Sequence, residues 1–85
     1  MTAIFSKHAL AQLERRGINT ERVLSIIASP DFVTTQNDQT RIYSKLVTEN
    51  SKCYLYRVFV NYLKEPALVI TAYKTSKIEK YGYKI

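Results

Sequence analysis

The spacing of hydrophobic positions divides the chain into a helical first third and a strand-rich remainder. The first predicted helix spans Lys7–Arg16, and its hydrophobic side, at 3.6 residues per turn, consists of Ala9, Leu10 and Leu13. Ser6 precedes this helix and is a favoured N-cap residue. Gly17 follows it and suits the left-handed conformation that commonly ends a helix.

A second predicted helix begins after a short link. Thr20 is its expected N-cap, and the helix covers Glu21–Ala28 before Pro30 ends it. Its buried side is crowded with aliphatic residues: Val23, Leu24, Ile26 and Ile27. The two helices are therefore expected to form a hairpin.

Beyond the helices the hydrophobic period changes to two, which is typical of strands. Four strands are predicted, at Phe32–Thr35, Arg41–Val47, Lys52–Tyr62 and Ala67–Tyr73. Short polar turns join them, so we expect an antiparallel meander. Ile4-Phe5 is a candidate for a further short edge strand, and the tail over 77–85 is either a last helical turn or a loose end.

These elements predict one α+β domain over residues 1–85, with an N-terminal helical hairpin packed on one face of a four-stranded antiparallel sheet. The buried residues should include Leu10, Leu13, Val23, Ile27, Val58 and Ile70. Arg41, Tyr43 and Lys45 share one side of the second strand, where burial of three polar groups would be costly. We therefore expect the helices on the other side and a basic, aromatic face left open.

The charge distribution agrees with such a face. Residues 1–39 have no net charge, whereas residues 40–85 carry nine basic and three acidic side chains, the whole formal charge of +6, and all seven tyrosines. A basic, tyrosine-rich surface attracts phosphate and stacks bases. The sequence therefore indicates RNA or another nucleic acid as the partner, although a high pI is also common among small proteins.

The rest of the composition indicates in which cellular compartment the protein is expected. One cysteine, Cys53, excludes an internal disulfide and suits a reducing compartment. No apolar run approaches the ~20 residues of a membrane span, and the N-terminus does not resemble a signal peptide. We expect a cytoplasmic protein without membrane contact, and the composition leaves its oligomeric state open.

The sequence has no glycine-rich phosphate loop, no metal-ligand spacing and no Ser-His-Asp set. The chemistry that remains is phosphodiester transfer without metal or cofactor, which needs a base, cations and a proton donor. His8 is the one side chain that ordinarily titrates near neutrality, and it lies opposite the hydrophobic side of its helix. It is either a catalytic group or an exposed first-turn residue.

Two arginines stand out for their positions. Arg57 lies amid apolar residues in the third predicted strand, where it is a phosphate clamp or one half of a buried ion pair. The clamp is favoured because the nearby strands offer no evident acidic partner. Arg16 lies beside the buried side of its helix and either holds the sheet or reaches a phosphate.

Several segments resemble a small bacterial family of unknown function: Phe5-Ser6-Lys7-His8-Ala9, Glu14-Arg15-Arg16-Gly17-Ile18, Val23, Ser29-Pro30-Asp31 and the block from Val69 to Tyr81. Arg16-Gly17-Ile18 is also similar to the lysine-histidine-glycine-valine segment of BrnT-type toxins. The chain thereby resembles the RelE/ParE-like superfamily, which includes many toxins of toxin–antitoxin pairs.

The resemblance implies a RelE/ParE-like fold, an antitoxin partner and metal-independent cleavage of RNA by arginines, lysines and often a C-terminal tyrosine. It places Tyr73 and Lys77 where RelE-like toxins hold catalytic groups. The alternative is that Tyr73 only packs at the edge of the sheet and that Lys77 is an ordinary solvated lysine. The predicted catalytic set is thus His8, Arg57, Tyr73 and Lys77, and the predicted RNA-binding set is Arg16, Arg41, Tyr43 and Lys45. The competing hypotheses are a non-catalytic module that binds nucleic acid or an acidic protein, and a degenerate member that keeps only the fold.

Overall fold

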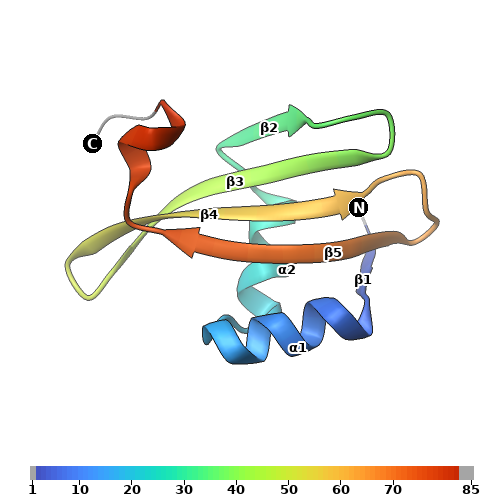
Figure 1. Cartoon of the computed structure of the whole chain (residues 1–85), viewed down its shortest axis with the longest axis horizontal. Coiled ribbons are helices and arrows are strands. Elements are labelled where there is room, and N and C mark those ends of the chain that lie inside the picture. Colours follow the sequence, from blue (N-terminus) through green and yellow to red (C-terminus); the bar gives the residue numbers. More distant parts are fainter. Residues whose placement is uncertain (1, 83–85) are drawn as a thin grey trace.

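A computed structural model describes residues 2–82 and shows two helices against one face of a five-stranded sheet (Figure 1). The α+β class is therefore confirmed. In chain order the elements are β1 (Ala3–Phe5), α1 (Lys7–Arg16), α2 (Thr20–Ala28), β2 (Phe32–Thr35), β3 (Thr40–Glu49), β4 (Lys52–Asn61), β5 (Ala67–Thr75) and the 3-10 helix η1 (Ile78–Tyr81).

The strand order in the sheet is β1-β5-β4-β3-β2. The four strands β2 to β5 pair antiparallel, as the short turns predict, but β1 adds a parallel strand beside β5. The expectation of a purely antiparallel four-stranded sheet is wrong in this respect. The candidate edge strand at Ile4-Phe5 is confirmed as β1, but its parallel pairing with β5, in which Ala3 lies beside Ala67, spans most of the chain and has no local signal.

Local signals at the helix ends are largely confirmed. The Ser6 hydroxyl accepts a hydrogen bond from the Ala9 amide, and Gly17 is left-handed with φ of 67°. The cap of α2 differs from the prediction, because Asn19 and not Thr20 accepts the Arg22 amide, at 2.7 Å. Asparagine is an equally favoured N-cap residue, so the helix begins one residue earlier.

The main core lies between the helices and the sheet. Its members are contributed by both helices and by the central strands, among them Leu13, Val23, Ile27, Tyr56, Val58 and Val69. Two expected members differ: Leu10 is 45% exposed, and Ile70 is only half-buried. Helix α1 packs along β5 through Ala9 and Leu13, one turn apart, and this leaves Leu10 on its flank.

The prediction of which sheet face stays open is wrong. Tyr43 is buried in the core beneath the helices, so the set with Arg41 and Lys45 is on the covered side. The two cations avoid burial at the margins of that side. Lys45 donates to the Ser29 carbonyl at 2.8 Å and pairs with Asp31, while Arg41 stacks 4.0 Å above the Tyr62 ring.

The opposite side of the sheet is the open face. One row of register partners crosses it, consisting of Phe32, Ser44, Arg57 and Tyr73. Three aliphatic residues, Ile42, Leu55 and Ile78, are buried without belonging to the helix-side core. Ile78 belongs to η1, which lies above the sheet while α1 lies below it (Figure 1). The open face is therefore partly covered, at one end, by η1.

None of the described helices is both long enough and apolar enough to cross a membrane.

Candidate functional site

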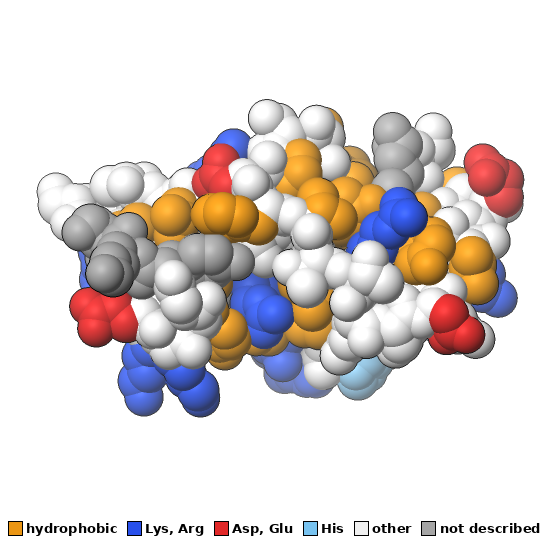
Figure 2. Space-filling view, turned by 90° about the horizontal axis from the view of Figure 1, so that it is seen from above, with side chains coloured by type: hydrophobic (Ala, Val, Ile, Leu, Met, Phe, Trp, Pro, Cys, Tyr) orange, Lys and Arg blue, Asp and Glu red, His pale blue; other side chains and the backbone are white. Residues whose placement is uncertain are grey.

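A group of aromatic side chains surrounds one arginine on the open face, and we call Arg57, Phe59, Tyr73 and Tyr81 the Arg57 site. Arg57 and Tyr73 are register partners on β4 and β5, so strand alternation directs both side chains to the same side. Tyr81 comes from η1. Figure 2, a view from above, shows Lys and Arg side chains among hydrophobic ones on this side of the molecule.

The contacts in the Arg57 site are close. The Arg57 Nη1 donates a hydrogen bond to the Tyr73 hydroxyl at 2.7 Å, and that hydroxyl lies 3.2 Å from the Tyr81 hydroxyl. The guanidinium carbon is 4.6 Å from the Tyr81 ring centre and 5.5 Å from that of Phe59. These distances are in the range of cation–π contacts, which hold the planar guanidinium in place.

Arg57 is half-buried, yet no carboxylate among residues 2–82 pairs with it. The ion pairs of the described residues involve Glu49 and Asp31 instead. A guanidinium has five N–H donors, and Arg57 uses some of them on the hydroxyls of Tyr73 and Tyr81. Such a cation, oriented by aromatic rings and without a counter-ion, is suited to binding a phosphate.

The two tyrosines differ in electrostatic environment. Burial is the main cause that raises the pKa of Tyr73, and its hydrogen bond with Tyr81 adds to the effect. The pKa of Tyr81 is lowered, chiefly by the hydrogen bond from Tyr73 and also by the positive charges of Lys80 and Arg57. Neighbouring groups whose pKa values move apart are suited to opposite roles in proton transfer. Tyr73 is the group that stays protonated to higher pH and can act as the acid, and Tyr81 is the group that ionises first and can act as the base.

The structure brings three of the four predicted catalytic residues to the open face or to the segment beside it. Arg57 and Tyr73 touch, and Lys77 begins the segment that carries Tyr81. His8 lies exposed on α1, which packs against β5 and the opposite side of the sheet, and no described contact links it to the Arg57 site. The four residues therefore do not form one cluster.

The predicted RNA-binding set is also dispersed. Arg16 donates to the Ala72 carbonyl at 2.8 Å and to the Thr71 hydroxyl at 3.2 Å, which fastens α1 to β5. Tyr43 is in the core, and Arg41 and Lys45 are engaged at the margins of the covered side. A role of these four residues in RNA binding stays a prediction. The open face that Arg41, Tyr43 and Lys45 were expected to share is, however, the covered side of the sheet.

Sequence reasoning missed Tyr81 and Phe59. A signal for Tyr81 was present in the tail, where Ile78 is an isolated aliphatic residue with a tyrosine three positions later. That spacing lets a single turn anchor itself and present an aromatic ring. Phe59 had a clearer signal, because it lies two residues from Arg57 on the same strand face.

A second polar cluster is structural. Glu49 accepts hydrogen bonds from Tyr56 at 2.6 Å and Lys74 at 2.9 Å, and Arg22 lies 3.4 Å away. These contacts join the end of β3 to β4, β5 and α2. The hydrogen bond from Tyr56 is the main cause that lowers the pKa of Glu49, and Lys74 lowers it further. All four groups have hydrogen-bond or ion-pair partners within the cluster, so we infer that the cluster stabilises the fold.

The model of one protein family, described as a domain of unknown function (DUF4258), matches residues 5–74. The match covers both helices and nearly all of the sheet and ends just after Tyr73, so Lys77 and Tyr81 lie beyond it. No curated protein and no solved structure matches the chain.

Proposed function

This chain belongs to the DUF4258 family, and we propose from its Arg57 site that it is a metal-independent endoribonuclease of the toxin type. The single observation that carries the proposal is an arginine with no carboxylate partner among residues 2–82, beside two hydrogen-bonded tyrosines whose pKa values are shifted in opposite directions. Cleavage of a phosphodiester needs these parts: a cation at the phosphate, a base and an acid.

In the proposed reaction, Arg57 binds the non-bridging oxygens of the scissile phosphate. The ribose 2′-oxygen forms a bond to phosphorus, and the bond from phosphorus to the 5′-oxygen of the next nucleotide breaks. Tyr81, as the phenolate, accepts the 2′-hydroxyl proton, and Tyr73 gives its proton to the departing oxygen. The products end in a 2′,3′-cyclic phosphate and a 5′-hydroxyl.

The contact between the two tyrosines completes the cycle. After cleavage Tyr81 is protonated and Tyr73 is not, while their hydroxyl oxygens are 3.2 Å apart. A proton can pass directly from Tyr81 to Tyr73 and restore the starting state. Arg57 donates to the Tyr73 oxygen and so stabilises its transient negative charge, which explains why these three groups are adjacent.

The resemblance to RelE-like toxins supports the same assignment, since those enzymes use arginines, lysines and often a C-terminal tyrosine. Tyr81 is such a tyrosine, and Lys77 lies in the same segment. The implied partner is an antitoxin, for which an acidic protein would complement the chain's formal charge of +6. RNA as substrate also agrees with the cytoplasmic setting expected from the sequence.

The test is cleavage of single-stranded RNA by the purified protein in the presence of EDTA, with the ends of the products analysed. We expect cyclic phosphate ends, and Arg57→Ala should lose about 10²–10³ in rate. Arg15→Ala is the matched control, because Arg15 is an exposed arginine on α1. His8→Ala should cleave like the wild type.

Two results would redirect the assignment. RNA that binds at Arg57 but stays intact, both alone and on ribosomes, would favour the non-catalytic binding module. Cleavage lost in His8→Ala but kept in Tyr81→Phe would overturn the roles given to the tyrosines. Induced expression of the same variants, scored for growth arrest, tests the toxin part separately.

A further inference from the structure

We propose that Lys77 and Lys80 of the C-terminal turn form a second phosphate subsite, which holds the RNA phosphate next to the one at Arg57. The inference rests on the proposed function and adds to it a substrate class: single-stranded RNA that engages the protein through at least two consecutive phosphates. Both lysines lie beyond the segment that the family model matches.

The turn that carries the lysines is anchored to the sheet. Ile78 is only 1% exposed although its neighbours Lys77 and Glu79 are exposed. Tyr81, at the other end of η1, contacts Tyr73 and Arg57. The turn is thus held at both ends against the open face, so its exposed side chains keep a defined position relative to the Arg57 site.

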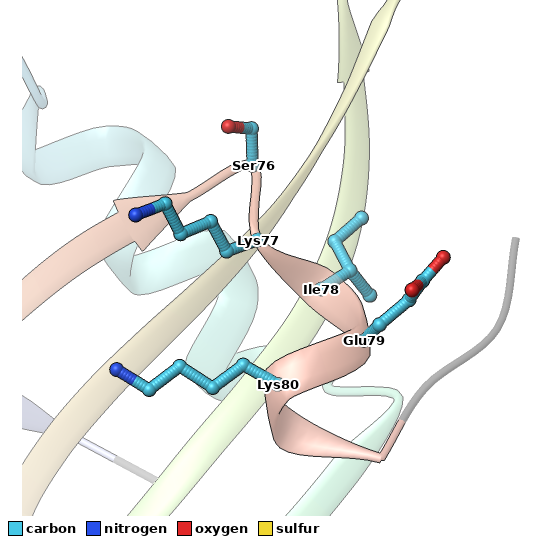
Figure 3. Close-up of a pocket in the computed structure, with 5 residues that line it drawn as sticks. All are labelled: Ser76, Lys77, Ile78, Glu79 and Lys80. Carbon is cyan, nitrogen blue, oxygen red and sulfur yellow. The ribbon is translucent and has the colours of Figure 1, made fainter.

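The two lysines lie on one side of this turn. Lys77 is the residue directly before η1, and Lys80 lies within η1 three positions later. Figure 3 shows both amino groups extending in the same direction, while Glu79 points away from them. A hollow lined by residues 76–80 lies beside them. The turn therefore separates its two positive charges from its negative one.

No ion pair within residues 2–82 neutralises the charges of these two lysines. Lys45 and Lys74 pair with Asp31 and Glu49, but no ion pair within residues 2–82 involves Lys77 or Lys80. The charge of Lys80 is among the causes that lower the pKa of Tyr81, so it acts within electrostatic range of the Arg57 site. An unpaired lysine pair at this range is suited to an adjacent phosphate.

Single-stranded RNA is the form that fits two such subsites. Its backbone can bend from the Arg57 site towards an exposed turn, and its unpaired bases can stack on rings such as Phe59. A duplex presents its phosphates on a rigid surface and keeps its bases stacked inside. We therefore expect binding to grow with the number of phosphates in a short single strand and to be weak for a duplex.

The experiment is an NMR titration at low salt with two probes, a 2′-O-methyl dinucleotide with one phosphate and a 2′-O-methyl trinucleotide with two. The methyl group prevents cleavage, so only binding is measured. The wild type should bind the trinucleotide several-fold more tightly, with a log–log salt slope steeper by about 0.7. The double variant Lys77→Ala/Lys80→Ala should lose this gain and bind the dinucleotide like the wild type.

The matched control is Lys7→Ala/Lys64→Ala, which removes the same charge from two exposed lysines elsewhere. It should keep the trinucleotide gain. The proposal of a second subsite is wrong if Lys77→Ala/Lys80→Ala still binds the trinucleotide more tightly than the dinucleotide by the wild-type factor, or loses no more of that factor than the control. The proposed role of the Arg57 site is not affected by that result. If Arg57→Ala leaves dinucleotide binding unchanged, or the wild type binds neither probe, the proposed function fails and the subsite with it.

Discussion

The guanidinium of Arg57 donates a hydrogen bond to the hydroxyl of Tyr73 across two paired strands, at 2.7 Å. This contact explains how an arginine is tolerated in mid-strand with no acidic partner in the part of the chain that the structure describes. The ring centres of Phe59, Tyr73 and Tyr81 lie 5.5, 5.9 and 4.6 Å from the guanidinium carbon, and the Tyr73 oxygen accepts from one donor. The remaining donors are the reason why we propose the open face as a binding surface.

The first prediction concerns pH. If Tyr81 is the base, the cleavage rate should rise with pH towards its lowered pKa, because only the phenolate accepts a proton. The rate should fall once the pH passes the raised pKa of Tyr73, which must stay protonated. Tyr81→Phe should remove the rising limb and cost about 10²–10⁴ in rate at unchanged RNA affinity. A wild-type pH profile in that variant would contradict the assignment.

The second prediction concerns the anchor of the C-terminal turn. Ile78→Ala should release η1 from the sheet, because Ile78 is its one buried side chain. We expect the Gly82 amide, which donates to the Glu79 carbonyl, to exchange faster with solvent. RNA cleavage should fall as in Tyr81→Phe. Ile78→Val keeps most of the buried side chain, so the Gly82 amide should exchange as slowly as in the wild type and RNA cleavage should be retained.

Much of the fold could be predicted because its signals are local. Ser6 and Gly17 mark the ends of one helix within twelve residues, and the short polar turns predict the antiparallel pairing of β2 to β5. The isolated position of Arg57 among apolar residues also pointed to the centre of the site. These inferences depend only on residues that are near one another in the chain.

The parts that could not be predicted depend on distant contacts or on long side chains. The prediction of the covered face is wrong because Tyr43 buries its ring, while the long side chains of Lys45 and Arg41 reach Asp31 and Tyr62 and so avoid burial. The prediction assumed that a polar side chain on the covered face must be buried, whereas a long side chain can place its charged end at the margin of that face. Tyr81 joins the site through a turn too short to have a periodicity of its own.

The third prediction compares two aliphatic residues that the sequence pattern treated alike. Ile27 is 6% exposed in the core, whereas Leu10 is 45% exposed. Ile27→Ala should lower the free energy of unfolding by roughly 2–5 kcal/mol, because it leaves a cavity between α2 and the sheet. Leu10→Ala should lower it by less than about 1 kcal/mol. Urea denaturation of both variants measures the difference, and equal losses would contradict the packing of α1.

The fourth prediction concerns the cluster around Glu49. Its pKa is lowered in the folded protein, chiefly by the hydrogen bond from Tyr56, so the folded state favours the carboxylate. Glu49 therefore adds stability at pH values above its unfolded pKa of about 4.3, and this contribution is lost as the pH falls through the lower folded pKa. Glu49→Gln should cost about 1–2 kcal/mol of unfolding free energy at neutral pH.

The cost of Glu49→Gln should shrink in acid, because the wild-type carboxyl is then protonated and also neutral. Denaturation of both proteins at a series of pH values from neutral to strongly acidic measures the change. Glu79→Gln is the control, since Glu79 is exposed on η1 and no ion pair within residues 2–82 involves it. A difference between wild type and Glu49→Gln that stays constant over the whole range would show that shape, and not the charge of Glu49, holds α2, β3 and β5 together.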